Sequence, residues 1–152
     1  MIGELYADQV NIAPETEGFN VNGDADDMYN RLTEGTSIAL YDNSMFNSGY
    51  FAIGFANGAL DFIDAADGDP FPLEPGSKAE VARIKGELHF VRAYAYYWVA
   101  RAYLPAYQND EKRIPWRINQ AANFDEAITS ELASANDVYQ LIIDDLAAAN
   151  RL

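Results

Sequence analysis

The chain of 152 residues has the length of one domain and carries 10 Lys and Arg against 24 Asp and Glu, a formal net charge of −14 at pH 7. This charge repels polyphosphates and excludes nucleic acid as a partner, whereas 49% hydrophobic and 13% aromatic residues are too many for a disordered acidic chain. With no cysteine and a single histidine, His89, the sequence has no disulfide framework, thiolate zinc site or histidine-rich metal cluster, and no cofactor is indicated.

Residues 1–45 are rich in Asn, Asp, Gly and Thr, and no apolar helical stripe persists there. We therefore expect a mostly irregular N-terminal segment. The first residues have neither the basic start nor the apolar core of a signal peptide, and the longest apolar stretches are far shorter than the roughly 20 residues that span a bilayer.

A first helix is predicted over residues 46–65. Its apolar face recurs at spacings of three and four residues: Tyr50, Ile53, Asn57, Leu60 and Ile63. Gly49, Gly54 and Gly58 each cost such a helix about 1 kcal/mol relative to alanine. Glycines kept at that cost predict that another helix approaches closely.

A second helix is predicted over residues 77–103, after a loop at residues 67–76 that contains three prolines and two glycines. Ser77 and Glu80 have the spacing of a capping box, and Pro105 ends the helix near Tyr103. Two apolar stripes run along it, which predicts burial on two sides, with its aromatic residues in the core: Tyr94, Tyr96, Tyr97 and Trp98.

A long connection is predicted at residues 107–129, with an extended stretch near 113–117. A third helix then begins at Ser134, which caps it while Asp137 reaches back to Ser134. Its predicted buried side consists of Val138, Leu141, Ile142, Leu146, Ala149 and Leu152. Because this pattern still runs at the last residue, we expect the chain to be a fragment of a longer one.

Four blocks of the sequence resemble the RagB/SusD family of outer-membrane glycan-binding lipoproteins. The run GELHFVRAYAYYWVARAY (residues 86–103) is similar to the family's long helix, and NDVYQLIIDDLAAA (residues 136–149) is similar to a later one. Residues 50–60 and the turn at residues 113–116 match in the same order. The characteristic positions include Asn57, Glu87, Phe90, Arg92, Arg101, Tyr139 and Asp145.

The resemblance implies an all-α fold of antiparallel helix hairpins like tetratricopeptide repeats, joined by long irregular loops. Residues 46–152 would then be the N-terminal part of a SusD-like helical scaffold. Within it Asp145 would be a structural residue. A guanidinium on a mostly apolar helix needs a carboxylate partner. We therefore expect Arg92 to contact Asp145, with Glu87 as the next choice of partner.

The same resemblance implies a non-catalytic function. The protein would bind an oligosaccharide or polysaccharide at the outward face of the cell outer membrane and deliver it to a SusC-like TonB-dependent transporter. Its membrane contact would come only from a lipid anchor outside this chain.

A glycan binder needs aromatic faces for the C–H surface of a sugar and polar groups for its hydroxyls. Aromatic residues in polar or proline-rich loops are therefore the candidate carbohydrate-binding residues: Phe19, Tyr29, Phe71, Tyr107 and Trp116. Each of them could instead serve only to pack its loop.

Other functions are weaker hypotheses. Asp144 and Asp145 diverge by about 100° on a helix and do not form a glycosidase pair, so a glycan hydrolase ranks last. The acidic loop that starts at Asp64 lacks the final glutamate of an EF-hand, because its twelfth position is Pro75, and no metal site is predicted. The main alternative is a helical-repeat adaptor that binds a protein segment in a groove.

Overall fold

The computed structural model describes residues 36–105, 110–121 and 130–151, and side chains from residue 45 onward within those ranges. The described elements are α3 (Thr36–Ala65), α4 (Ser77–Tyr103), β1 (Ile114–Pro115), β2 (Leu132–Ala133) and α6 (Ala135–Ala149). The chain divides into two compact units between residues 47 and 48, and the packed helices and strands belong to the second unit.

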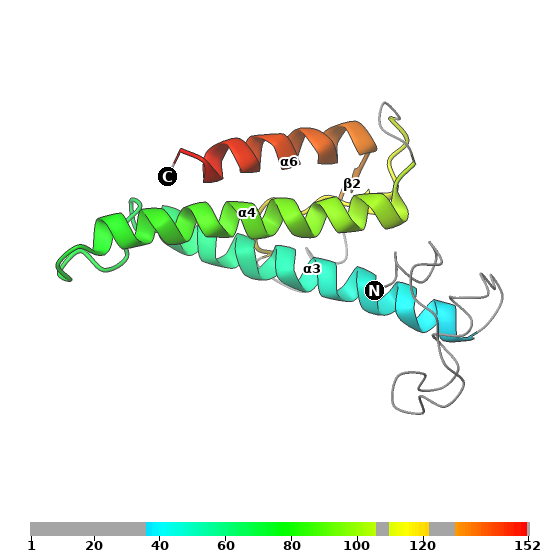
Figure 1. The fold of residues 1–152 in the computed structure, drawn as a ribbon, viewed down its shortest axis with the longest axis horizontal. Helices are drawn as coiled ribbons and strands as arrows, with labels where there is room; N and C mark the ends of the chain where they lie inside the picture. The colour runs from blue at the N-terminus through cyan, green and yellow to red at the C-terminus, as the bar shows by residue number, and fades with distance from the viewer. Residues whose placement is uncertain (1–35, 106–109, 122–129, 152) are drawn as a thin grey trace, which may run out of the picture. The chain divides into compact units, whose positions relative to one another are not determined.

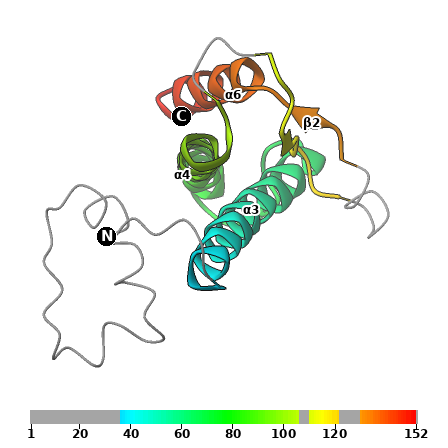
Figure 2. The same ribbon diagram turned by 90° about the vertical axis from the view of Figure 1, so that its right-hand side faces the viewer.

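The three helices are packed, and α4 runs antiparallel to both α3 and α6 (Figure 1). Viewed end-on, α6, α4 and α3 follow one another in an arc. The β1–β2 segment lies opposite α4, in the opening between α6 and α3 (Figure 2). The mostly helical architecture is therefore confirmed. It is not purely helical, because Ile114 pairs with Ala133 and Pro115 with Leu132 in a short antiparallel ladder.

The first helix begins at Thr36 rather than at residue 46, so the expectation of an irregular segment up to residue 45 is wrong for its last ten residues. Once a helix has nucleated, each added residue gains a backbone hydrogen bond. The helix can therefore extend through residues that lack an apolar stripe of their own. Residues 1–35 lie outside the described part of the chain.

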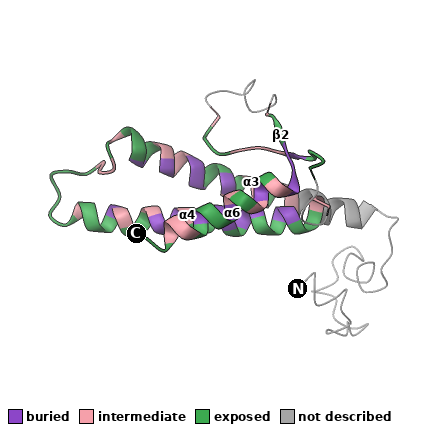
Figure 3. Ribbon diagram, turned by 90° about the horizontal axis from the view of Figure 1, so that it is seen from above, coloured by how far each residue is buried: buried purple, intermediate pink, exposed green. Residues whose placement is uncertain are grey.

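The core lies where α4 meets its two neighbours. One cluster joins α3, α4, α6 and both strands through Ile53, Ala93, Ala95, Tyr96, Val99, Ala100, Ile114, Ala133, Val138 and Ile142. A second cluster joins α3 and α4 near the loop between them through Leu60, Ile63, Val81 and Leu88. Buried and exposed positions consequently alternate along α4 (Figure 3).

The prediction that α4 is buried on two sides is wrong. Tyr96 is fully buried, but Tyr94 is 54% exposed, Trp98 41% and Tyr97 38%. Helices α3 and α6 contact adjoining faces of α4, and the small side chains of Ala93 and Ala100 line the buried side. Small residues allow helices to approach closely, so the large rings lie on the opposite face.

Gly49 shows why a helix interior here tolerates glycine. A Cβ atom built on Gly49 would overlap the Cγ2 methyl of Val99 on α4. One built on Gly58 would lie 2.8 Å from Oε1 of Gln120, whereas one on Gly54 meets nothing within 4 Å. The predicted close helix approach is confirmed at Gly49 and is absent at Gly54.

The helix starts differ in how far the sequence predicts them. The capping box of α6 is confirmed, since the Ser134 side chain accepts from the Asp137 amide and the Asp137 carboxylate accepts from Ser134. The one predicted for α4 is wrong: its N-cap is Gly76 in a left-handed conformation with φ of 81°. The Ser77 hydroxyl instead donates to Asp69 across the loop, at 3.0 Å.

Candidate functional site

A buried ion pair joins α4 and α6. Arg92 on α4 donates from Nε and Nη2 to the two carboxylate oxygens of Asp145 on α6, both at 2.7 Å. Both residues are buried, with residue exposures of 8% and 3%. This bidentate geometry is the strongest form of an arginine–carboxylate contact, and it confirms the predicted pairing of Arg92 with Asp145.

Asn57 extends this cluster to α3. Its Oδ1 atom accepts from Arg92 Nη1 at 2.9 Å, and its Nδ2 atom donates to the carbonyl oxygens of Arg117 and Asn119. The same Nη1 of Arg92 also donates to the carbonyl of Ile118. Three helices and the connection after β1 therefore share one buried polar cluster, defined by Asn57, Arg92 and Asp145.

His89 contributes to the cluster from its edge. Its Nδ1 atom lies 2.8 Å from Oδ1 of Asp145, and its side chain is 16% exposed. The Asp145 carboxylate is thus occupied by two partners on α4. His89 therefore lies beside a carboxylate that also makes the bidentate contact with Arg92.

Two tyrosine hydroxyls fix the backbone beside Trp116. Tyr50 donates to the carbonyl of Pro115 at 2.7 Å, and the Tyr96 hydroxyl both donates to the carbonyl and accepts from the amide of Arg117. Burial raises the pKa of Tyr96 to about 12, and burial together with the nearby Tyr96 raises the pKa of Tyr50. Both phenols remain neutral over the whole physiological range.

The remaining residues that carry the resemblance lie elsewhere. Glu87 pairs with Arg83 on the exposed side of α4, not with Arg92. Phe90 and Arg101 lie on the same exposed side, and Tyr139 packs against the main core. In the described part of the chain, no group of three His, Asp or Glu side chains could hold a metal ion.

Three of the five candidate carbohydrate-binding aromatics, Phe19, Tyr29 and Tyr107, lie outside the described residues. The other two, Trp116 and Phe71, each line a cleft. The structure does not bring these two aromatics into one cleft.

Trp116 follows β1 directly, where its amide donates to the carbonyl of Glu131 at 2.7 Å. Its half-buried ring lies 6.2 Å from that of Tyr96. The ring borders a cleft of about 260 Å³ whose other wall is α6, lined by Asp137, Gln140, Leu141 and Asp144. Trp116 also borders a second cleft, on the side of Asn119 and Glu131.

The α6 wall of the first cleft carries an amide and a carboxylate one turn apart. Gln140 Nε2 donates to Oδ1 of Asp144 at 2.9 Å, and both side chains are exposed. Vicinal sugar hydroxyls can bridge such a pair while the sugar's C–H face rests on the indole. Gln140 and Asp144 are absent from the sequence-based carbohydrate-binding candidates, although their four-residue spacing on α6 is visible in the sequence.

Phe71 occupies a more exposed position than Trp116, in the loop before α4. Its ring is 55% exposed and borders a cleft of about 340 Å³ with Glu74, Glu80 and Ile84 among the lining residues. Its amide donates to Asp69, which also accepts from Ser77, so these two contacts hold the backbone of the loop at Phe71. Glu80, which could meet a hydroxyl, is already paired with Arg83.

The chain matches the model of a known protein family. The family model SusD-like_3, described as starch-binding and associating with the outer membrane, matches residues 5–152. No curated protein and no solved structure matches the chain. None of the described helices is long and apolar enough to cross a membrane.

Proposed function

The chain belongs to the SusD-like_3 family, and from this membership we propose that it binds a starch-like glycan at the outward face of the outer membrane and delivers it to a SusC-like TonB-dependent transporter. The family consists of non-catalytic binding proteins, so the chain is not an enzyme. Membership also implies an outer-membrane-associated, glycan-binding role. We also propose that the chain forms tetratricopeptide-like hairpins and that a lipid anchor outside this chain holds the protein at the membrane.

The family match over residues 5–152 is the single observation that carries this function. The cleft between Trp116 and α6 supports it, because an aromatic residue lines this cleft together with Gln140 and Asp144 of α6. The buried Asn57–Arg92–Asp145 cluster supports it indirectly. By holding the backbone of residues 117–119 against α3 and α4, it fixes the segment that carries Trp116.

Calorimetric titration of the protein with α-1,4-linked and β-1,4-linked glucose oligosaccharides of equal length tests the ligand class. We expect saturable binding of the α-linked series and no sugar release after long incubation. If neither series gives a binding heat, the proposal that the protein binds a starch-like glycan is contradicted.

The delivery step has a separate test. Affinity capture of the tagged protein from detergent-solubilised outer membranes should retain a TonB-dependent transporter. Absence of such a transporter from the captured material would contradict the proposed partner while leaving glycan binding intact.

A further inference from the structure

Trp116 is shared by two clefts in the surface of the molecule. The first, with α6 as its other wall, measures about 260 Å³. The second also measures about 260 Å³ and is lined by residues that follow Trp116 together with Ser130 and Glu131. Pockets that enclose a drug-sized ligand measure about 300–1,000 Å³, so each cleft by itself suits a small unit such as one sugar ring. Because both clefts include Trp116, together they have the size of a site for an oligosaccharide.

The backbone of the second cleft is anchored from inside the molecule. Residues 117–120 form an irregular segment, and each residue of this segment gives a backbone group to a buried or half-buried side chain or to a carboxylate of α3 or α4. The anchors are Tyr96 and Asn57 for Arg117, Arg92 for Ile118, Asn57 for Asn119, and Asp61 for Gln120. A segment that is already fixed loses little conformational entropy when a ligand binds, so this cleft is preorganised.

Two exposed residues that line the second cleft use only their carbonyl oxygens in these structural contacts. The carbonyl of Asn119 accepts from Asn57, and the carbonyl of Glu131 accepts from the amide of Trp116 at 2.7 Å. Both residues are exposed. An amide donates and accepts hydrogen bonds and a carboxylate accepts them, so the two side chains together match the needs of sugar hydroxyls.

The first cleft presents the same two kinds of group. Gln140 supplies an amide there and Asp144 a carboxylate, and both lie on α6. Asn119 and Glu131 repeat this combination in the second cleft. A linear oligosaccharide repeats its hydroxyl groups from one unit to the next, so repeated amide and carboxylate groups suit neighbouring units of one chain.

We propose that the second cleft is a second glycan subsite, lined by Arg117, Asn119, Ser130 and Glu131. One linear oligosaccharide then places neighbouring sugar units in the two clefts, and Trp116 contacts the chain between them. This inference rests on the proposed glycan binding and extends it to a site that takes more than one sugar unit.

The length of the ligand tests the proposal. The hexasaccharide of the α-1,4-linked glucose series is long enough to reach both clefts, whereas the monosaccharide occupies only one. In NMR titrations, Asn119→Ala/Glu131→Ala should weaken hexasaccharide binding about tenfold or more. The same double variant should bind the monosaccharide like wild type, because the first cleft is intact. Gln140→Ala should weaken binding of both ligands, and circular dichroism checks that each variant is folded.

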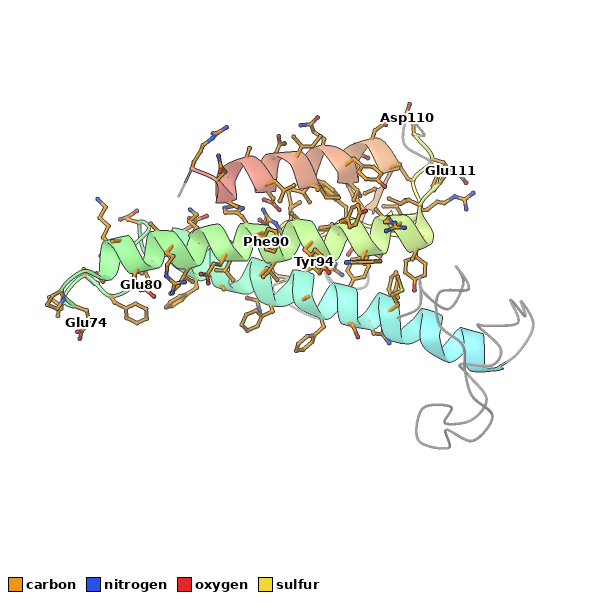
Figure 4. All side chains as sticks on the ribbon, viewed as in Figure 1. Glu74, Glu80, Phe90, Tyr94, Asp110 and Glu111 are labelled. Carbon is orange, nitrogen blue, oxygen red and sulfur yellow. The ribbon has the colours of Figure 1, made fainter. Side chains whose placement is uncertain are left out.

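Glu111→Ala is the matched control, because it removes an exposed carboxylate that lines neither cleft. Figure 4 shows Glu111 beside Asp110 in the segment that follows α4. This variant should bind the hexasaccharide like wild type. If Gln140→Ala weakens hexasaccharide binding but Asn119→Ala/Glu131→Ala does not, the second subsite is overturned and the proposed function stands. If the unmodified protein binds no member of the series, both are overturned.

Hydrogen exchange of the free protein measures whether the second cleft is preformed. The amide of Arg117 donates to the Tyr96 hydroxyl, and the amide of Gln120 donates to the carboxylate of Asp61. Both amides should therefore exchange slowly before any glycan is added. Exchange of both at the rate of an unstructured peptide would overturn the preformed subsite.

Discussion

Arg92 and Asp145 meet across α4 and α6 through two parallel N–H···O bonds of 2.7 Å, although they lie far apart in the sequence. Asn57 and the carbonyl of Ile118 take up a further arginine N–H, and His89 contacts the same carboxylate. The pair therefore connects all three helices to the segment that carries Trp116. The pair has a structural role, and it holds in place the backbone next to Trp116, which lines the candidate glycan cleft.

Arg92→Ala should lower the free energy of unfolding by about 3–5 kcal/mol, because it leaves the carboxylate of Asp145 buried without its main partner. Arg92→Lys should recover only part of this loss, since an ammonium cannot make the bidentate contact. Urea denaturation measures both. The control Arg83→Ala, at an exposed pair on the same helix, should change stability little. Equal effects of the two alanine variants would contradict the account.

Gly49 and Gly54 form a matched pair on α3. Gly49→Ala should destabilise the protein by about 1–3 kcal/mol because the new methyl group overlaps Val99. Gly54→Ala meets no atom within 4 Å and should stabilise the helix by about 0.5–1 kcal/mol. Thermal and urea unfolding of both variants measure the difference. The same sign for both would show that α3 does not approach α4 at Gly49.

Tyr96 makes stability sensitive to alkali. Burial raises the pKa of Tyr96 from 10.0 to about 12, so its contribution is complete below pH 10 and decreases as the pH rises toward 12. Tyr96→Phe should cost about 1–3 kcal/mol at neutral pH, because the amide and carbonyl of Arg117 lose their partner. The gap between wild type and variant should then narrow between pH 10 and 12. A constant gap across this range, measured by urea titration at each pH, would contradict the assignment.

The sequence predicts those parts of the fold that depend on neighbouring residues in the chain or on the partner that a buried charge requires. A guanidinium within an apolar helix requires a carboxylate partner, and the resemblance to the RagB/SusD family, which implies a structural role for Asp145, favoured Asp145 over Glu87 as that partner. The cap formed by Ser134 and Asp137 is equally local. The exposed face of α4 could not be predicted, because hydrophobicity ranks Trp98 above Ala93, while close packing of three helices selects the smaller residue for the interior.

The candidate site could be predicted only in part. Trp116 was a candidate because its loop is polar, but the residues that share its cleft come from α6. The two segments meet through the β1–β2 ladder, and the sequence predicted the extended stretch that contains β1 but not its pairing with β2. In the sequence alone, nothing distinguishes Gln140 and Asp144 from other polar surface residues of a helix. The pairing of Ile114 with Ala133 places the segment that carries Trp116 beside the start of α6.

The most direct test of the central claim is calorimetric titration of an α-1,4-linked glucose oligosaccharide into Trp116→Leu, Gln140→Ala and Phe51→Ala. Leucine keeps apolar packing against Tyr96 but removes the flat ring, and Phe51 is an exposed aromatic with no part in the cleft. We predict that Trp116→Leu and Gln140→Ala weaken binding about tenfold or more, a loss of about 1.4 kcal/mol, while Phe51→Ala binds like wild type. Unchanged affinity in Trp116→Leu and Gln140→Ala would contradict the assignment of the cleft between Trp116 and α6 as the glycan site.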